Sequence, residues 1–301
     1  MNDPVAAAAQ FLAGHGRLLE RRRLEHFLDP GPEAVEAVVT ALAACRNADH
    51  GIGFLEPDLR TPASQPSAVL YALEVLAEVK AANSPLATGA LDWLTTVTNH
   101  DGGIPFVLPT AAGWPHAPWW TPVPDPPSSL LMTAGVAGTA YGLDGDHRWL
   151  GPATSYVWAH LKDLKLSDPY TLRYVVRFLD AIPDRARADA ELDVLRDRMP
   201  EDGVLRVEAG VEGEVLSPLE IAPRPDHAGA RLVPEELIER HLDALAGEQQ
   251  DDGGWTFTWQ AWNPAAALEW RGMQTLTALN TLRANGRLPD TRREATTGAG
   301  A

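Results

Sequence analysis

Apolar residues recur every three to four positions along most of the chain, which is the period of an amphipathic α-helix. The clearest stripes cover residues 35–45, 69–76, 130–143, 172–179, 237–245 and 276–282. Alternating apolar and polar positions are scarce, and only residues 204–215 resemble a short β-hairpin. The pattern therefore predicts an all-α fold.

A turn made of an acidic residue and glycine recurs between these helices. Its copies occupy residues 49–54, 101–106, 202–204 and 251–255, with the first glycine at 51, 102, 203 and 253. The spacing is thus about fifty residues with one double interval, and we expect a degenerate copy near Gly151-Pro152. Glycine supplies the left-handed conformation that ends a helix, and aspartate closes the turn onto its own backbone. The chain has room for about six such units.

Helix pairs of this period either stack as an open solenoid or close into a ring. Six units favour closure, and the small residues at 133–140 suit a tightly packed inner ring. We therefore predict an α/α toroid of about six helical hairpins around an apolar hollow, with residues 1–291 as a single domain. Residues 292–301 lack apolar periodicity and are predicted to be a disordered tail.

Composition and charge narrow the functional classes. Hydrophobic residues make up 45% and charged residues 22% of the chain, which is typical of a folded globular protein. The net charge of -16 repels nucleic acid and anionic lipid headgroups, so we expect no nucleic-acid partner. The Arg21-Arg22-Arg23 run is either a solvated helix face or a diphosphate-binding patch. With neither a secretory leader nor a long apolar run, the sequence predicts a cytoplasmic protein without a transmembrane segment, whose oligomeric state stays open.

The sequence contains no motif for a metal or another cofactor, and we predict neither. Cys45 is the only cysteine, and its helical spacing from Val38 and Leu42 indicates a buried apolar role. The histidines form no HExxH pattern, so His50, His100 and His116 would share a metal only if successive loops converged. Phosphate-binding, dinucleotide-binding and GxSxG motifs are lacking as well.

The Gln249-Gln250-Asp251-Asp252-Gly253-Gly254-Trp255 segment resembles the glutamine-tryptophan repeat of squalene-hopene and oxidosqualene cyclases and of the related prenyltransferase β-subunits. Residues 49–54 and 99–106 resemble weaker copies. In that family the repeats tie neighbouring outer helices together, so the resemblance implies the toroid fold rather than a chemistry. It also implies a terpenoid cyclase-like role in isoprenoid or natural-product metabolism.

Class II cyclases of this family protonate an alkene or epoxide with the central aspartate of an Asp-x-Asp-Asp motif. The matching segment here is 124–129, where Asp125 corresponds to the first aspartate. Pro127 and Ser128 stand where the second and third acids would be, so the central acid is missing. Asp125 is therefore either an acid or a residue that approaches and caps the next helix.

Seven of the ten tryptophans cluster in two inter-helix loops that we expect at one rim of the ring. Indole faces line apolar pockets and stabilise carbocations, although they also serve as plugs that pack loops onto helix ends. The proposed substrate-binding residues are Trp114, Trp119, Trp120, Trp255, Trp259, Trp262, Trp270 and Arg271, and the candidate catalytic residues are Asp125, Asp101, His116, Asp226 and His227. Glu220 and Glu269 accompany them, and Arg271 either pairs with a carboxylate or contacts a diphosphate.

Three hypotheses follow. The first is a terpenoid cyclase-like enzyme that binds an apolar isoprenoid substrate in the toroid and performs metal-independent, acid-initiated cyclisation or isomerisation. The second is a non-catalytic toroid that binds an isoprenoid, a lipid or a protein partner. The third is a carbohydrate-active α/α barrel, which requires two carboxylates flanking a tryptophan-lined groove.

Overall fold

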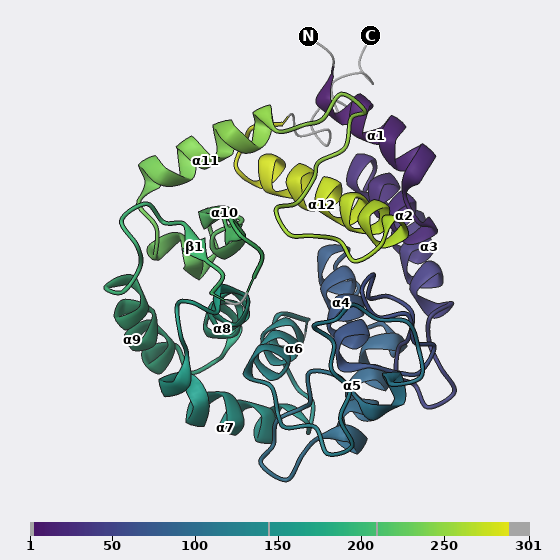
Figure 1. Ribbon diagram of the computed structural model, residues 1–301, viewed down its shortest axis with the longest axis vertical. Coiled ribbons are helices and arrows are strands. Elements are labelled where there is room, and N and C mark those ends of the chain that lie inside the picture. The colour runs from purple at the N-terminus through teal and green to yellow at the C-terminus, as the bar shows by residue number, and fades with distance from the viewer. Residues whose placement is uncertain (1–2, 144, 209, 289–301) are drawn as a thin grey trace.

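The computed structural model describes residues 3–143, 145–208 and 210–288, and these form a ring of two concentric layers of helices (Figure 1). The outer layer contains α1 (Pro4–His15), α3 (Pro32–Ala43), α5 (Pro85–Val97), α7 (Leu150–His160), α9 (Arg185–Arg196) and α11 (Glu235–Gly247). The inner layer contains α2 (Leu18–Leu28), α4 (Pro66–Glu78), α6 (Leu130–Leu143), α8 (Pro169–Ala181), α10 (Pro218–Ile221) and α12 (Pro264–Ala284). The predicted all-α toroid is confirmed.

Short elements fill the connections between these helices. They are the 3-10 turns η1 (Pro109–Ala111), η2 (Leu161–Asp163) and η3 (Ala228–Arg231) and the strands β1 (Leu205–Arg206) and β2 (Val215–Leu216). The strands pair antiparallel, with Leu205 opposite Leu216, so the predicted hairpin exists but is only two residues deep. Proline is the first residue of α1, α3, α4, α5, α8, α10 and α12, where its missing N–H costs no hydrogen bond.

The first two acidic-glycine turns share one set of hydrogen bonds. Asp49 accepts from the Gly51 amide at 3.0 Å and from the Ser64 hydroxyl at 2.8 Å. Asp101 accepts from the Gly103 amide at 3.0 Å and from the Ser128 hydroxyl at 2.6 Å. Each turn thus anchors the start of the following inner helix, so the repeat is structural.

The turns also join neighbouring outer helices and close the ring. Gly253 has φ +89°, and a Cβ atom there would lie 2.2 Å from the carbonyl oxygen of Ala7 in α1. The Gln249 side chain donates to the Pro4 carbonyl at 2.8 Å. The turn after α11 therefore packs directly against the first turn of α1, and only glycine fits at the contact.

One prediction about the repeat is wrong. Gly151 and Pro152 do not form a degenerate turn, because they lie in the first turn of α7, where the Pro152 carbonyl contacts Gly102 of the preceding turn. The missing turn follows α7 instead. There η2 leads to Asp168, whose side chain caps α8 by accepting from the Thr171 amide at 3.2 Å.

Small residues let α6 pack closely between α4 and α8, as the sequence predicts. A Cβ atom at Gly135 would lie 2.9 Å from the Tyr174 ring and 3.0 Å from Leu70. One at Gly138 would lie 2.7 Å from the backbone nitrogen of Phe178. The inner helices α4 and α8 therefore both pack closely against α6.

The predicted tail, residues 292–301, lies outside the described residues. Among the helices that the structure describes, none combines the length and apolar character needed to span a bilayer.

Candidate functional site

Charged and aromatic side chains meet where α2 and α4 pack together. Glu20 is fully buried and accepts hydrogen bonds from Arg17 at 2.8 Å and from the Tyr71 hydroxyl at 2.9 Å. Arg23 donates to Tyr71 at 2.7 Å and forms an ion pair with Glu78 at 2.5 Å. The contact between these two inner helices therefore contains a buried polar network. Of the arginine run 21–23, Arg23 is a buried structural cation.

The segment 54–61, which we call the rim segment, contacts both tryptophan-rich loops. The Arg60 amide donates to the Pro115 carbonyl at 2.9 Å, and the Ala117 amide donates to the Asp58 carbonyl at 2.8 Å. On the other side, the Trp262 indole donates to the Pro57 carbonyl at 3.4 Å. Both loops thus lie against one segment, at one rim of the ring as expected.

Glu56 is the carboxyl group in this segment with the most perturbed acidity. Burial raises the pKa of Glu56 to about 8, and the negative charges of Asp58 and Glu74 add to the effect. Arg17 opposes it only in part. The Glu56 carboxyl is therefore protonated at neutral pH and able to act as a general acid.

Asp58, two residues further on, is 3% exposed, and burial raises its pKa too. The indole of Trp270 and the guanidinium of Arg60 act in the opposite direction, which places both close to this carboxylate. Asp58 Oδ1, Arg60 Nη2 and Trp270 Nε1 are buried without a partner of good hydrogen-bond geometry, so the Trp270 indole that lowers the pKa of Asp58 approaches it only at imperfect geometry. Unpaired buried polar atoms are costly, so their concentration at one place indicates a site built for a polar ligand group or water.

Glu269, at the start of α12, completes this group of side chains. Its carboxylate accepts from Arg60 at 2.8 Å and from Arg17 at 3.3 Å. We call Glu56, Asp58, Arg60, Glu269 and Trp270 the rim cluster.

A second group of charged side chains lines the inner face of α8. Arg173 pairs with Glu220 of α10 at 2.7 Å, and Arg177 pairs with Glu74 of α4. The Tyr174 ring lies beneath both guanidinium groups, at 4.8 Å and 5.3 Å from their central carbons. We call Arg173, Tyr174 and Arg177 the α8 arginine wall.

The structure places three of the predicted catalytic residues away from these groups. Asp125 is exposed in the long loop before α6. Asp226 is exposed and pairs with Arg224 at 3.1 Å. Asp101 holds its own turn, and the bonds from Gly103 and Ser128 lower its pKa against a partial desolvation cost.

The two predicted histidines lie apart from each other. His116 Nδ1 is 2.6 Å from the Trp114 carbonyl oxygen and lies opposite Leu59 of the rim segment. His227 caps η3, accepting from the Gly229 amide at 3.1 Å, while its Nε2 is 3.5 Å from Asp180. Burial lowers the pKa of His227, so its imidazole is neutral at neutral pH.

The first tryptophan loop divides between surface and interior. Trp114 and Trp119 are 44% and 48% exposed, whereas Trp120 is buried and stacks on Phe106 with a centroid distance of 4.3 Å. In the second loop Trp255 is buried, and its indole donates to the Leu245 carbonyl at 2.8 Å, which is a structural role.

The other three tryptophans proposed to bind substrate lie at the rim cluster. Trp259 meets Trp270 edge to face at 5.2 Å, and Trp262 bonds the segment that carries Asp58. Of the eight predicted substrate-binding residues, these three therefore lie beside the perturbed carboxyl groups.

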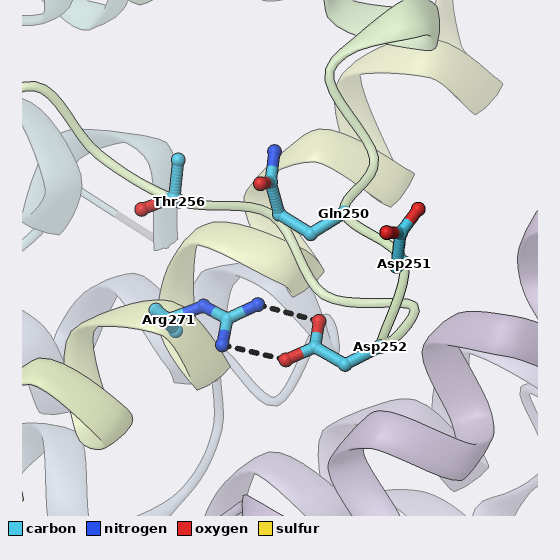
Figure 2. Close-up of a pocket in the computed structure, with 5 residues that line it drawn as sticks. All are labelled: Gln250, Asp251, Asp252, Thr256 and Arg271. Atoms are coloured by element: carbon cyan, nitrogen blue, oxygen red, sulfur yellow. Dashed lines mark hydrogen bonds and ion pairs between the residues drawn. The ribbon is translucent and has the colours of Figure 1, made fainter.

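Arg271 forms an ion pair, one of the two roles open to it from the sequence. Figure 2 shows both terminal nitrogens directed at Asp252, at 2.8 Å and 2.6 Å. They border an open pocket of about 430 Å³ lined by Gln250, Asp251, Asp252, Thr256 and Arg271. Arg271 also lies over the Phe11 ring at 4.5 Å, so it links α12, the last turn and α1.

The sequence pointed to Glu269 and Trp270 of the rim cluster, but not to Glu56, Asp58 and Arg60 or to the α8 arginine wall. Glu56, Asp58 and Arg60 follow a glycine turn as alternate charged positions, a weak signal without helical period. The signal on α8 was stronger. Tyr170, Arg173, Tyr174 and Arg177 recur at helical spacing, opposite the apolar stripe that marked the helix.

Cys45 follows α3 and is half-buried against the core, and burial raises the pKa of its thiol, which keeps it unreactive. Within residues 3–143, 145–208 and 210–288, no three His, Cys, Asp or Glu side chains are grouped as metal ligands.

Neither a family model nor a curated protein matches this sequence. Solved structures do match its fold. A protein from Actinoplanes has a TM-score of 0.60 at 16% identity, covering 94% of this chain and 98% of its own. The type II terpene cyclase MstE from Scytonema has a TM-score of 0.55 at 14% identity, covering 95% of this chain and 98% of its own. A single-residue variant of MstE has also been solved with geranylgeranyl dihydroxybenzoate as substrate, at a TM-score of 0.55 and 14% identity over 95% of this chain and 97% of its own. At these identities the likeness concerns the fold, and this chain has the fold of a terpene cyclase.

Proposed function

We propose that this protein is a terpenoid cyclase-like enzyme that binds an isoprenoid compound at the inner side of the rim and starts a cyclisation or isomerisation by proton transfer from Glu56. The observation that carries the proposal is the position of Glu56 beside Asp58 in a segment contacted by both tryptophan loops, where burial raises the pKa of Glu56 to about 8. The MstE fold, which accommodates a geranylgeranyl substrate in that protein, supports the same class of ligand.

The neighbouring groups suit the charge that such a reaction develops. Protonation of the substrate leaves a cation, which the Trp259 and Trp270 faces and the Asp58 carboxylate stabilise. Asp58 can also remove the final proton, because one of its oxygens carries no hydrogen bond.

The acidity of Glu56 restricts the substrate. A carboxyl group with a pKa of about 8 keeps its proton at neutral pH but is a weak donor toward an unactivated alkene. The proposal therefore favours a substrate with a more basic entry point, such as an epoxide or a carbonyl conjugated to the reacting alkene.

The test is incubation of the purified protein with geranylgeranyl dihydroxybenzoate, farnesyl and geranylgeranyl diphosphate, squalene and their epoxides, followed by mass spectrometry of the extracts. We expect turnover of an epoxide or carbonyl-activated compound and, in Glu56→Gln, a rate about 10²- to 10⁴-fold lower. Glu239→Gln, in the exposed pair with Arg287, is the matched control and should keep full activity. Absence of turnover with every compound, or full activity in Glu56→Gln, would refute the proposal.

The second candidate is a carrier that binds the isoprenoid without converting it. Glu56 is a weak proton donor toward an unactivated alkene. The carrier role is therefore favoured for isoprenoids that lack an epoxide or a conjugated carbonyl. An isoprenoid that co-purifies and survives long incubation unchanged would support the carrier over the enzyme.

A further inference from the structure

The inner face of α8 carries two arginines whose planes are held by a shared aromatic ring. Arg173 lies 4.8 Å from the centroid of Tyr174 and Arg177 lies 5.3 Å from it. Tyr174 is itself fixed, because it packs against Gly135 of α6. Stacking on a buried ring orients a guanidinium and reduces the entropy lost when it binds a ligand.

Both arginines are paired, yet both remain partly accessible. Arg173 bonds Glu220 at 2.7 Å and the Tyr174 hydroxyl at 3.2 Å, but its Nε is buried without an acceptor. The side chains of Arg173 and Arg177 keep 26% and 34% of their surface exposed. A small group entering the ring can therefore reach the exposed part of each guanidinium.

We propose that Arg173 and Arg177 bind an oxyanion, either carboxylate or phosphate, carried by the ligand as its headgroup. The planar fork of a guanidinium matches such groups in geometry and charge. That the anion is attached to an isoprenoid chain rests on the proposed function, whereas the anion site itself does not.

The position of Glu74 connects this site to the rim cluster. Glu74 pairs with Arg177 and lies close enough to Glu56 for its charge to act on that carboxyl group. A headgroup on the α8 arginine wall would thus be separated from the acid by Glu74, and the chain would extend from it toward the indoles of the rim. The net charge of -16 opposes anion binding only weakly, because charges beyond about 8 Å are screened at physiological salt.

The experiment is calorimetric titration with four probes: geranylgeranyl diphosphate, geranylgeranoic acid, geranylgeraniol and inorganic pyrophosphate. Glu56→Gln protein is used so that turnover does not interfere. We expect at least one anionic prenyl compound to bind about 10- to 100-fold more tightly than the alcohol. Comparison of diphosphate with carboxylate identifies which anion the site prefers.

The decisive variant is Arg173→Gln/Glu220→Gln, which removes the guanidinium without leaving Glu220 unpaired. It should lower the affinity for the anions to that of the alcohol while leaving the alcohol affinity unchanged, with folding checked by circular dichroism. Arg187→Gln is the control, because Arg187 is exposed on the outer helix α9, over Trp158.

Equal binding of anions and alcohol, an unchanged preference in the double variant, or no binding of any probe would overturn the anion site. Pyrophosphate binding that depends on Arg173, without turnover of any prenyl compound, would support the site and refute the proposed enzyme. Turnover that depends on Glu56, with no preference for the anions, would refute only the site.

Discussion

Arg17 Nη1 lies 3.3 Å from Glu269 Oε2, so an ion pair joins the second helix of the chain to the last across the closure of the ring. The same carboxylate accepts from Arg60 at 2.8 Å, which ties the rim segment to this closure. Arg17, Arg60 and Glu269, whose charges act on Glu56 or Asp58, therefore also hold the two ends of the ring together.

Replacing Glu269 should consequently cost stability. In Glu269→Gln we expect the free energy of unfolding to fall by about 1–3 kcal/mol, because Arg60 and Arg17 lose their shared charged acceptor. Urea denaturation measures the change. Glu239→Gln removes an exposed pair and should change stability by less than about 0.5 kcal/mol. Equal values for the two variants would contradict the structural role of Glu269.

The raised pKa of Glu56 predicts how stability depends on pH. The unfolded carboxyl ionises near 4.5 and the folded one near 8, so the folded state holds the proton between these values. The contribution to stability is fully present below pH 4.5 and is lost as the pH rises to about 8. Glu56→Gln lacks this loss and should melt at least about 2 °C above the wild-type protein at pH 9. Melting curves at pH 6 and pH 9 check it. A wild-type protein that loses no more stability over this interval than the variant would show that Glu56 is not perturbed.

The close approach of α6 and α8 predicts a sharp difference between two glycines of one helix. Gly138→Val would place a side chain 2.7 Å from the Phe178 backbone and should cost about 1–3 kcal/mol or more. Gly142→Ala meets nothing within 4 Å and should instead stabilise the helix by about 0.5–1 kcal/mol. Thermal unfolding of both variants decides whether the helices are packed as described.

Gly253 is the corresponding test of ring closure. Gly253→Ala combines a left-handed conformation, which costs about 1–3 kcal/mol by itself, with a clash against the Ala7 carbonyl. We expect a large drop in the unfolding midpoint and faster proteolysis of α1. Gly247→Ala, with free space around its Cβ position, should leave both unchanged. Similar behaviour of the two would mean that the turn does not hold α1.

The sequence by itself determined the repeat and its helices. The turns at Asp49 and Asp101, the stripes of α4, α8 and α11, and the small residues of α6 all follow from local rules of period, capping and packing. The prediction at Gly151-Pro152 was wrong because proline is common both in turns and in the first turn of a helix. Only the contact between Pro152 and Gly102 distinguishes the two cases.

Only the tertiary structure decided which side chains meet inside the ring. Glu56 and Glu269 are more than two hundred positions apart and both approach Arg17, while Glu74 and Arg177 pair across α6. The acidity of Glu56 depends first on burial, then on its neighbour Asp58, and further on Arg17 and Glu74; the burial and the last two charges are not encoded in the residues next to it. Local pattern therefore predicted the ring, and the long-range electrostatics of its interior arose from closure.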